Sequence, residues 1–415
     1  MSEANQELER SIRGLNWTYA LLGAADATLL PYIPLYLAAR HLDVFEIGVV
    51  LAIAAAGWFI AGLAWAYLGD RTGKPEGAVI AACVAAGIAS LLIPLSSGAV
   101  GLGAVIAILS IARSPFAMLD PITLQRLREA SRTRYARIRL RMSGGWALSA
   151  VIAGDAYQLA GLKLMPFVYA VMVALFGLWA WRALRPAGAQ RAQVERTTTI
   201  TPRRFSAVSF AILGFSGACL LLGVSSAAAQ NFVTLRINFL GGGALLIGAA
   251  AAFQAVTEIP TMGFTHVLTR RLSNGALFAI GCAIFVAVFF AWGVVTNPVA
   301  LALLKFVTGV GFALTFVAAV LITDELWPAR LRATGQLVTK SVMFGLAPIA
   351  GNFGGGYVYD TYGPAAMFVI SAVLVGAAGI GAMLAVPARS AAMKFAAPVT
   401  PIIRPEPVAA VLEEH

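Results

Sequence analysis

Long apolar blocks separated by short polar stretches run along the chain from residue 14 to residue 386. A helix needs about 20 apolar residues to cross a bilayer, and windows of that length predict twelve membrane-spanning helices. The predicted limits are 14–38, 47–68, 77–97, 99–119, 142–162, 164–181, 206–229, 240–265, 275–297, 299–323, 334–358 and 364–386. The pattern indicates an all-α membrane protein.

The longest polar stretch between these spans, residues 185–204, separates spans one to six from spans seven to twelve. Two matches indicate that the halves are repeats: ARIR (136–139) corresponds to ARLR (329–332), and LGDRTGK (68–74) corresponds to LTRRLSN (268–274). Such repeats typically form two pseudo-symmetric bundles around a central cavity. We expect a tail (1–13), a six-helix bundle (14–181), a linker (182–205), a second six-helix bundle (206–386) and a disordered, Pro-rich tail (387–415).

Composition agrees with the pattern, because the chain is 60% hydrophobic and only 12% charged, whereas soluble domains are about 25% charged. The net charge of +11 does not indicate nucleic-acid binding, since the basic residues flank apolar spans and form no face of their own. Each predicted inner loop carries at least two basic residues, and no outer loop carries more than one: Arg40, Lys163 or Arg236. The asymmetry predicts that both termini are cytoplasmic, in a cell membrane such as the bacterial inner membrane.

Few charged residues fall within or at the edges of the spans: Asp26, Arg113, Asp120, Asp155, Glu258, Lys305 and Lys340. Spans three, six, nine and twelve carry none. Charged groups at membrane depth face protein or water rather than lipid. The charged spans are therefore expected to line the cavity.

Glu258 lies in span eight, where a charge costs on the order of 3 kcal/mol. Its carboxylate is expected either to pair with a cation such as Arg113 or Lys340, or to be protonated. A carboxylate that alternates between these states carries protons, whereas a static one only locks helices together. Pro260 follows closely and predicts a kink.

Asp26 precedes Pro31 and Pro34, which break the helical ladder of span one near a potential site. Lys305 and Lys340 are candidates for binding an anionic group, and the alternative for Lys305 is snorkelling to the outer interface. Arg113 is a binding candidate or simply neutralises Asp120.

The sequence contains no GxxxxGK[ST], HExxH, CxxC or GxSxG motif. Its three cysteines, Cys83, Cys219 and Cys282, each lie inside an apolar block and have no metal-ligand or disulfide spacing. We therefore predict no enzymatic activity, no metal and no cofactor.

The loop LGDRTGK (68–74) resembles the G-x-L-x-D-R-x-G-R/K signature of the major facilitator superfamily, at Leu68, Asp70, Arg71, Gly73 and Lys74, with Ala66 in place of the leading glycine. PYIPLYL (31–37) and YARIRLRMSGGWALSA (135–150) resemble the branch that holds lactose permease, nucleoside–proton symporters and phenylpropionate permeases. Arg141 and Met142 depart from that branch's usual aromatic and glycine. The resemblance covers residues 14–386 and implies a gating role for Asp70, Arg71, Gly73 and Lys74.

The resemblance also implies roles for single residues. Arg139 matches the arginine that binds substrate in the sugar permease, and Asp120 lies one residue from the place of its acidic partner. Lys305 matches a lysine of span ten, and Gln254 takes the place of an acidic residue in span eight. The sugar permease's proton relay is not reproduced, because Thr308 and Gly311 replace its histidine and glutamate.

These observations predict a secondary transporter that moves a small organic solute by proton symport and acts as a monomer in the bilayer. Glu258, Asp26 and Asp120 are the candidate proton sites. The candidate substrate ligands are Arg139, Arg113, Lys305, Lys340 and Gln254. An exporter working by proton antiport, a uniporter and a membrane sensor that moves nothing are the alternatives.

Overall fold

The computed structural model describes residues 3–72, 75–127, 132–184, 210–328 and 331–386, which form helices and no strands. Their bounds in the first half are α1 (Glu3–Ala27), η1 (Leu30–Tyr32), α2 (Ile33–Ala39), α3 (Val44–Thr72), α4 (Pro75–Leu92), η2 (Ile93–Leu95), α5 (Gly98–Arg113), η3 (Ser114–Met118), α6 (Leu119–Leu127), α7 (Arg132–Ala160), η5 (Leu162–Leu164) and α8 (Met165–Ala183). Those in the second half are α9 (Phe210–Phe239), α10 (Ala244–Arg271), α11 (Asn274–Val294), α12 (Pro298–Leu326), α13 (Arg332–Ser341), η7 (Val342–Leu346) and α14 (Ala347–Ala385).

Twelve crossings result from these elements, as predicted. Within the described ranges, ten stretches are long and apolar enough to span a membrane, and the last of them, Thr334–Ala385, contains two crossings. Gly363, with φ of 84°, and Pro364 divide those two, since glycine adopts this backbone conformation without strain. The remaining crossing is α7, whose first third is rich in arginine.

The first crossing is broken where Pro31 and Pro34 predicted a break. Helix α1 ends at Ala27, η1 begins at Leu30 and α2 begins at Ile33. Proline cannot donate the backbone hydrogen bond that a continuous helix needs. Asp26 is therefore placed at the end of α1, directly before the interruption.

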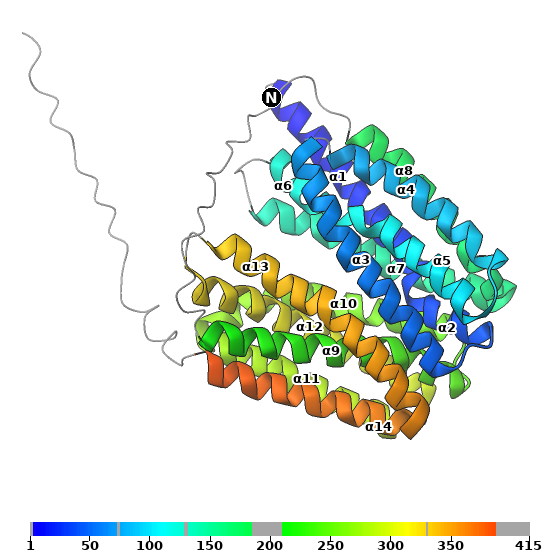
Figure 1. The fold of residues 1–415 in the computed structure, drawn as a ribbon. Coiled ribbons are helices and arrows are strands. Elements are labelled where there is room, and N and C mark those ends of the chain that lie inside the picture. Colours follow the sequence, from blue (N-terminus) through cyan, green and yellow to red (C-terminus); the bar gives the residue numbers. More distant parts are fainter. Residues whose placement is uncertain (1–2, 73–74, 128–131, 185–209, 329–330, 387–415) are drawn as a thin grey trace, which may run out of the picture.

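Two six-helix bundles lie side by side and diverge like the arms of a V (Figure 1). One end of the molecule holds the beginning of α1 and the end of α14, and we call it the terminal end. The other, which we call the loop end, holds the connections 40–43, 240–243 and 295–297. The bundles approach each other at the loop end and separate toward the terminal end.

Contacts between the halves come chiefly from two helix pairs, α3 with α14 and α7 with α10. Glycine makes both contacts close. A Cβ on Gly48 would lie 2.8 Å from the Cα of Gly356, and a Cβ on Gly248 would lie 2.2 Å from the carbonyl oxygen of Ala150. Only small residues let helix backbones approach this closely.

Internal symmetry appears in the packing as well as in the sequence. Gly23 of α1 lies against the backbone of Met142, and about 200 residues later Gly223 of α9 lies against the backbone of Met343. The same helix crossing is therefore built twice, as expected of a duplicated six-helix unit.

The predicted end of span seven at residue 229 was wrong. Helix α9 continues to Phe239, and Arg236, assigned to an outer loop by the sequence, is buried in its last turn. Arg236 donates hydrogen bonds of 3.1 Å to the carbonyls of Gly293 and Val295. A hydropathy window scores such residues as polar even when protein groups satisfy them.

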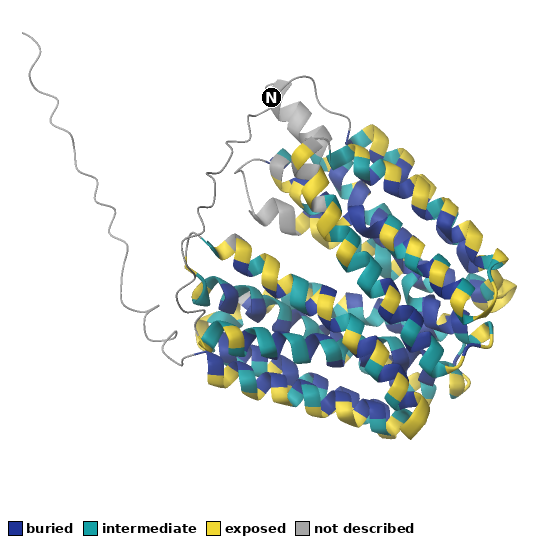
Figure 2. Cartoon of the chain, in the orientation of Figure 1, coloured by how far each residue is buried: buried dark blue, intermediate teal, exposed yellow. Residues whose placement is uncertain are grey.

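Exposed residues lie on the outer faces of the bundles, whereas buried residues lie along the sides where helices face each other (Figure 2). Many of the exposed residues are large and apolar. Val100, Leu95 and Leu384 are more than 80% exposed. Exposed apolar side chains in such numbers indicate a surface that contacts lipid.

Candidate functional site

An ion pair joins Asp26 at the end of α1 to Arg113 at the end of α5. The Nη2 of Arg113 lies 2.6 Å from Oδ1 of Asp26, and both residues are at least nine-tenths buried. Arg113 is the sixteenth residue of α5, which places the pair about 22 Å from the loop end. The alternative that Arg113 neutralises Asp120 was wrong, because Arg113 pairs with Asp26 and Asp120 bonds to Tyr19.

Asp120 forms a second polar contact on the terminal side of this pair. Its Oδ1 accepts a hydrogen bond of 2.6 Å from the hydroxyl of Tyr19 and lies 4.0 Å from Nε of Arg139. The side chains of Asp120 and Arg139 are each 44% exposed. The two residues that the resemblance placed together are therefore close in space, with access to water.

Lys305 is the eighth residue of α12, in the second half. Its ammonium donates to the side-chain oxygen of Gln230 on α9 and to that of Gln254 on α10, the latter over 3.4 Å. It also lies 5.4 Å from the ring centre of Trp292. Lys305 is only 6% exposed, so it does not reach the interface by snorkelling.

Glu258 lies one turn beyond Gln254 on α10 and is partly buried. No hydrogen bond or ion pair holds its carboxylate in the described part of the chain. The charge that acts on it is that of Arg139, across the contact between α7 and α10. The two predicted partners were wrong, because Arg113 is engaged by Asp26 and Lys340 is exposed at the end of α13.

Helix α10 runs through Pro260 without ending. Beside Glu258, the hydroxyl of Thr257 donates a hydrogen bond of 2.7 Å to the carbonyl of Phe306 on α12. Gly309 has no side chain, which leaves room for α10 and α12 to approach here. The hydroxyl of Thr261 donates a hydrogen bond of 2.7 Å to the carbonyl of Thr257. The bond of Thr261 lies within α10, so the hydroxyl of Thr257 is the group that ties α10 to α12 next to the glutamate.

The predicted gating residues lie at the terminal end, away from these groups. Asp70 and Arg71 belong to the last turn of α3, and Arg71 lies 5.3 Å from the ring centre of Tyr67. Gly73, Lys74 and the side chain of Asp70 lie outside the described parts of the structure. Arg71 forms no part of the group around Lys305 and Glu258.

Several side-chain amides that the sequence did not single out also join the helices. Gln230 helps to hold Lys305. The side chain of Asn352 on α14 donates a hydrogen bond of 3.4 Å to the carbonyl of Leu51 on α3. Its side-chain oxygen accepts a hydrogen bond of 2.7 Å from Asn231. The side-chain oxygen of Gln158 on α7 accepts a hydrogen bond of 3.3 Å from the backbone N–H of Leu245 on α10. A search for uncharged polar residues within apolar spans would have found them.

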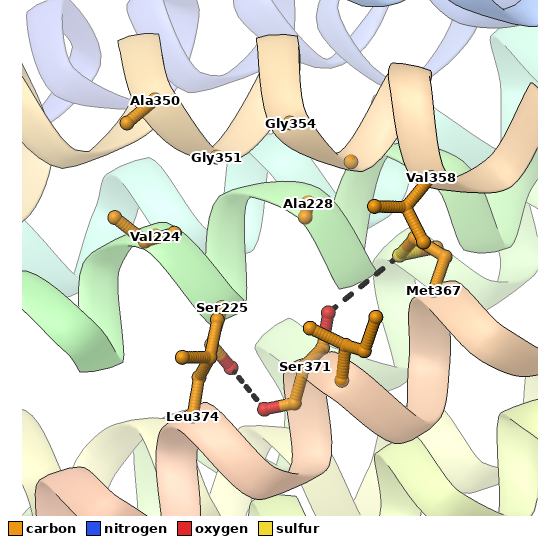
Figure 3. A pocket seen from close by; sticks show the side chains of 12 residues that line it. Val224, Ser225, Ala228, Ala350, Gly351, Gly354, Val358, Met367, Ser371 and Leu374 are labelled. Carbon is orange, nitrogen blue, oxygen red and sulfur yellow. Dashed lines mark hydrogen bonds between the residues drawn. The ribbon is translucent and has the colours of Figure 1, made fainter.

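A separate cavity of about 140 Å³ lies between α9 and the two parts of α14 (Figure 3). Its lining is apolar apart from Ser225 and Ser371. The hydroxyl of Ser225 donates a hydrogen bond of 2.8 Å to the backbone carbonyl of Ser371. None of the charged residues described above lines it. The polar groups around Glu258 and Lys305, rather than this cavity, form the candidate site.

Comparisons with known proteins agree with this arrangement. A curated relative, the maltose permease of Geobacillus stearothermophilus, is 24% identical over 361 residues, which cover 86% of this chain and 89% of the permease. A crystal structure of the nucleoside transporter NupG has a TM-score of 0.75 at 14% identity and covers 90% of this chain and 98% of NupG. A peptide transporter, POT, in complex with alafosfalin has a TM-score of 0.70 at 14% identity, covering 91% of this chain and 94% of POT.

The profile of the MFS_1 like family matches residues 12–370. This match covers most of both bundles, and the relatives by sequence and by structure are transporters. The chain therefore belongs to the MFS_1 like family and is a membrane transporter of the major facilitator type, not an enzyme.

Proposed function

We propose that this transporter moves a small organic solute together with protons by alternating access. The observation that carries the proposal is Glu258, a carboxylate about 21 Å from the loop end along α10. In the described residues it has no hydrogen bond or ion pair to hold it in one state. An intramembrane carboxylate without a fixed partner is suited to bind and release a proton.

Rocking of the halves supplies the coupling. Glu258 belongs to the second half and Arg139, whose charge acts on it, to the first. When the halves move, the distance between Glu258 and Arg139 changes. The charged form of Glu258 is then stabilised more or less strongly by the charge of Arg139. A charge pair that forms in one state and separates in the other links proton occupancy to the conformation. Asp26 and Asp120 remain further candidate proton sites, each already engaged by an arginine.

The substrate is expected to bind between the halves. Lys305 and Gln254 are the strongest of the candidate ligands, because they meet in one cluster at the level of the loop-end contacts. Arg139 is accessible beside Asp120. Arg113 is neutralised by Asp26, and Lys340 is exposed at the end of α13, so both are weaker candidates.

Orientation follows from the basic residues at the terminal end. Arg71, Arg126, Arg141, Arg182, Arg270 and Arg271 lie there. Basic residues concentrate on the cytoplasmic side of membrane proteins, so the terminal end faces the cytoplasm and the V opens inward. The transporter works as a monomer in a bacterial inner membrane, with a cytoplasmic linker (182–205) between bundles 14–181 and 206–386.

The relatives are named for maltose, nucleosides and peptides. These names support transport of organic solutes and single out no class for this chain.

The test uses proton flux in proteoliposomes that contain a pH dye. Pools of aromatic acids, nucleosides and sugars are added to wild type, Glu258→Gln and Asp155→Asn. Asp155 is an exposed carboxylate near the loop end of α7 and serves as the control. We expect acidification with one pool in wild type and Asp155→Asn, and none in Glu258→Gln.

Two outcomes contradict the proposal. If Glu258→Gln retains gradient-driven accumulation and its pH dependence, Glu258 carries no proton. If the lumen becomes alkaline as solute moves inward, or solute moves with no proton flux, the protein is an antiporter or a uniporter.

A further inference from the structure

The surroundings of Lys305 contain two polar partners, and both are neutral. An ammonium group has three N–H donors and no acceptor. Two of them meet the side-chain oxygens of Gln230 and Gln254. The third has no partner in the part of the chain that the structure describes.

The two glutamines are oriented by this contact. Because a lysine can only donate, each amide turns its oxygen toward Lys305, and its NH2 group is left for other partners. Over the described residues, neither of these NH2 groups makes a hydrogen bond. The cluster of Lys305, Gln230 and Gln254, which we call the donor cluster, therefore presents N–H groups from the ammonium and from both amides.

The positive charge of the donor cluster is not balanced locally. No carboxylate among the described residues lies within ion-pair distance of Lys305. Asp26 is held by Arg113, and Asp120 lies beside Tyr19 and Arg139. The face of Trp292 stabilises the ammonium in part. A buried cation without a counter-ion is costly, so a site built this way favours an anion.

We propose that the donor cluster binds the carboxylate of an organic monoanion, which makes the transported solute a monocarboxylate. This inference rests on the transport function proposed above and names its substrate class. A carboxylate supplies about four lone-pair sites and no donor, which matches the cluster's free N–H groups. A sugar hydroxyl is neutral and would leave the charge of the buried ammonium unbalanced. A phosphate dianion would need a second free cation, and Arg113 is already paired.

Binding to the purified full-length protein tests this without any transport. The probes are benzoate and propionate, each compared with its neutral amide, and inorganic phosphate. Thermal unfolding is followed as a function of probe concentration. We expect at least one carboxylate to raise the Tm of wild type, and the amides and phosphate to have no effect.

Two variants locate the site. Gln230→Glu places a carboxylate within reach of Lys305 by a covalent tether, so it should abolish the carboxylate effect while the protein stays folded. Lys305→Gln should weaken Kd by roughly ten- to a hundredfold, since it removes a charge-assisted hydrogen bond. Lys163→Gln removes an exposed lysine at the loop end and should bind as wild type does.

The inference is overturned if neither carboxylate stabilises wild type, if the amides or phosphate stabilise it equally, or if Gln230→Glu responds as wild type does. Its failure is separable from that of the proton-coupling proposal. Loss of proton flux in Glu258→Gln with unchanged carboxylate binding at Lys305 supports both. Carboxylate binding that needs Lys305, without any proton flux, overturns only the coupling.

Discussion

Gly48 of α3 and Gly356 of α14 pack backbone against backbone across the two halves. A Cβ on Gly48 would lie 2.8 Å from the Cα of Gly356 and 2.7 Å from the carbonyl oxygen of Asn352. The same region holds the hydrogen bond from Asn352 to Leu51. The absence of a side chain at residue 48 therefore permits the loop end to close.

Gly48→Val is expected to open the loop end. Overpacking typically costs about 1–3 kcal/mol, and this cost applies only to the state in which the loop end is closed. The population of the closed state should therefore fall by roughly five- to a hundredfold relative to the open state. Spin labels on the exposed residues Ser97 and Thr296, one in each half, would report a longer distance.

The matched control for this experiment is Gly62→Val. Gly62 lies on the same helix, and a Cβ there would meet nothing within 4 Å. Equal label distances in Gly48→Val and wild type would show that the backbone contact does not hold the loop end closed.

Breaking the ion pair between Asp26 and Arg113 should destabilise the protein strongly. Asp26→Asn leaves the guanidinium buried without its counter-ion, which costs about 3–5 kcal/mol. The double variant Asp26→Asn with Arg113→Gln removes both charges and should recover part of the loss. Thermal unfolding in detergent checks this, with Asp155→Asn as an exposed control. A double variant as unstable as the sum of the two single variants would exclude the coupling.

Transport is expected to be electroneutral. If a monocarboxylate binds the ammonium of Lys305 and a proton binds Glu258, the cargo carries one negative and one positive charge. A pH gradient should then drive uptake, and a potassium diffusion potential alone should not. Current recordings on supported membranes provide the measurement. A substrate-dependent net current would contradict this stoichiometry.

Asp70→Asn should slow turnover while leaving substrate affinity near that of wild type. Asp70 lies in the last turn of α3 at the terminal end, far along the helix from the residues that contact α14 near Gly48. A change there is expected to alter the exchange between conformations rather than binding. Paired measurements of KM and kcat in proteoliposomes test it, and a loss confined to affinity would contradict the gating role.

The sequence was sufficient for the twelve crossings and the repeat of six helices, because hydropathy is summed along a single helix and the bilayer sets its length. It was also sufficient for the break near Pro31, since the missing backbone donor acts locally. It failed at the end of α9, where the Nη2 of Arg236 bonds to the carbonyls of Gly293 and Val295 at the end of α11, far away in the chain.

Only the tertiary structure decided which polar groups meet. Sequence reasoning predicted that Glu258, Lys305, Arg113 and Asp26 belong to the interior. It offered Asp120 as one possible partner of Arg113, and Arg113 or Lys340 as possible partners of Glu258. The structure places Arg113 on Asp26 and Lys305 on two neutral amides, and the charge of Arg139 acts on Glu258. These pairings depend on how each helix is rotated and how closely it approaches its neighbours. Glycine contacts such as Gly48 with Gly356 set that approach, and they join residues that lie hundreds of positions apart in the chain.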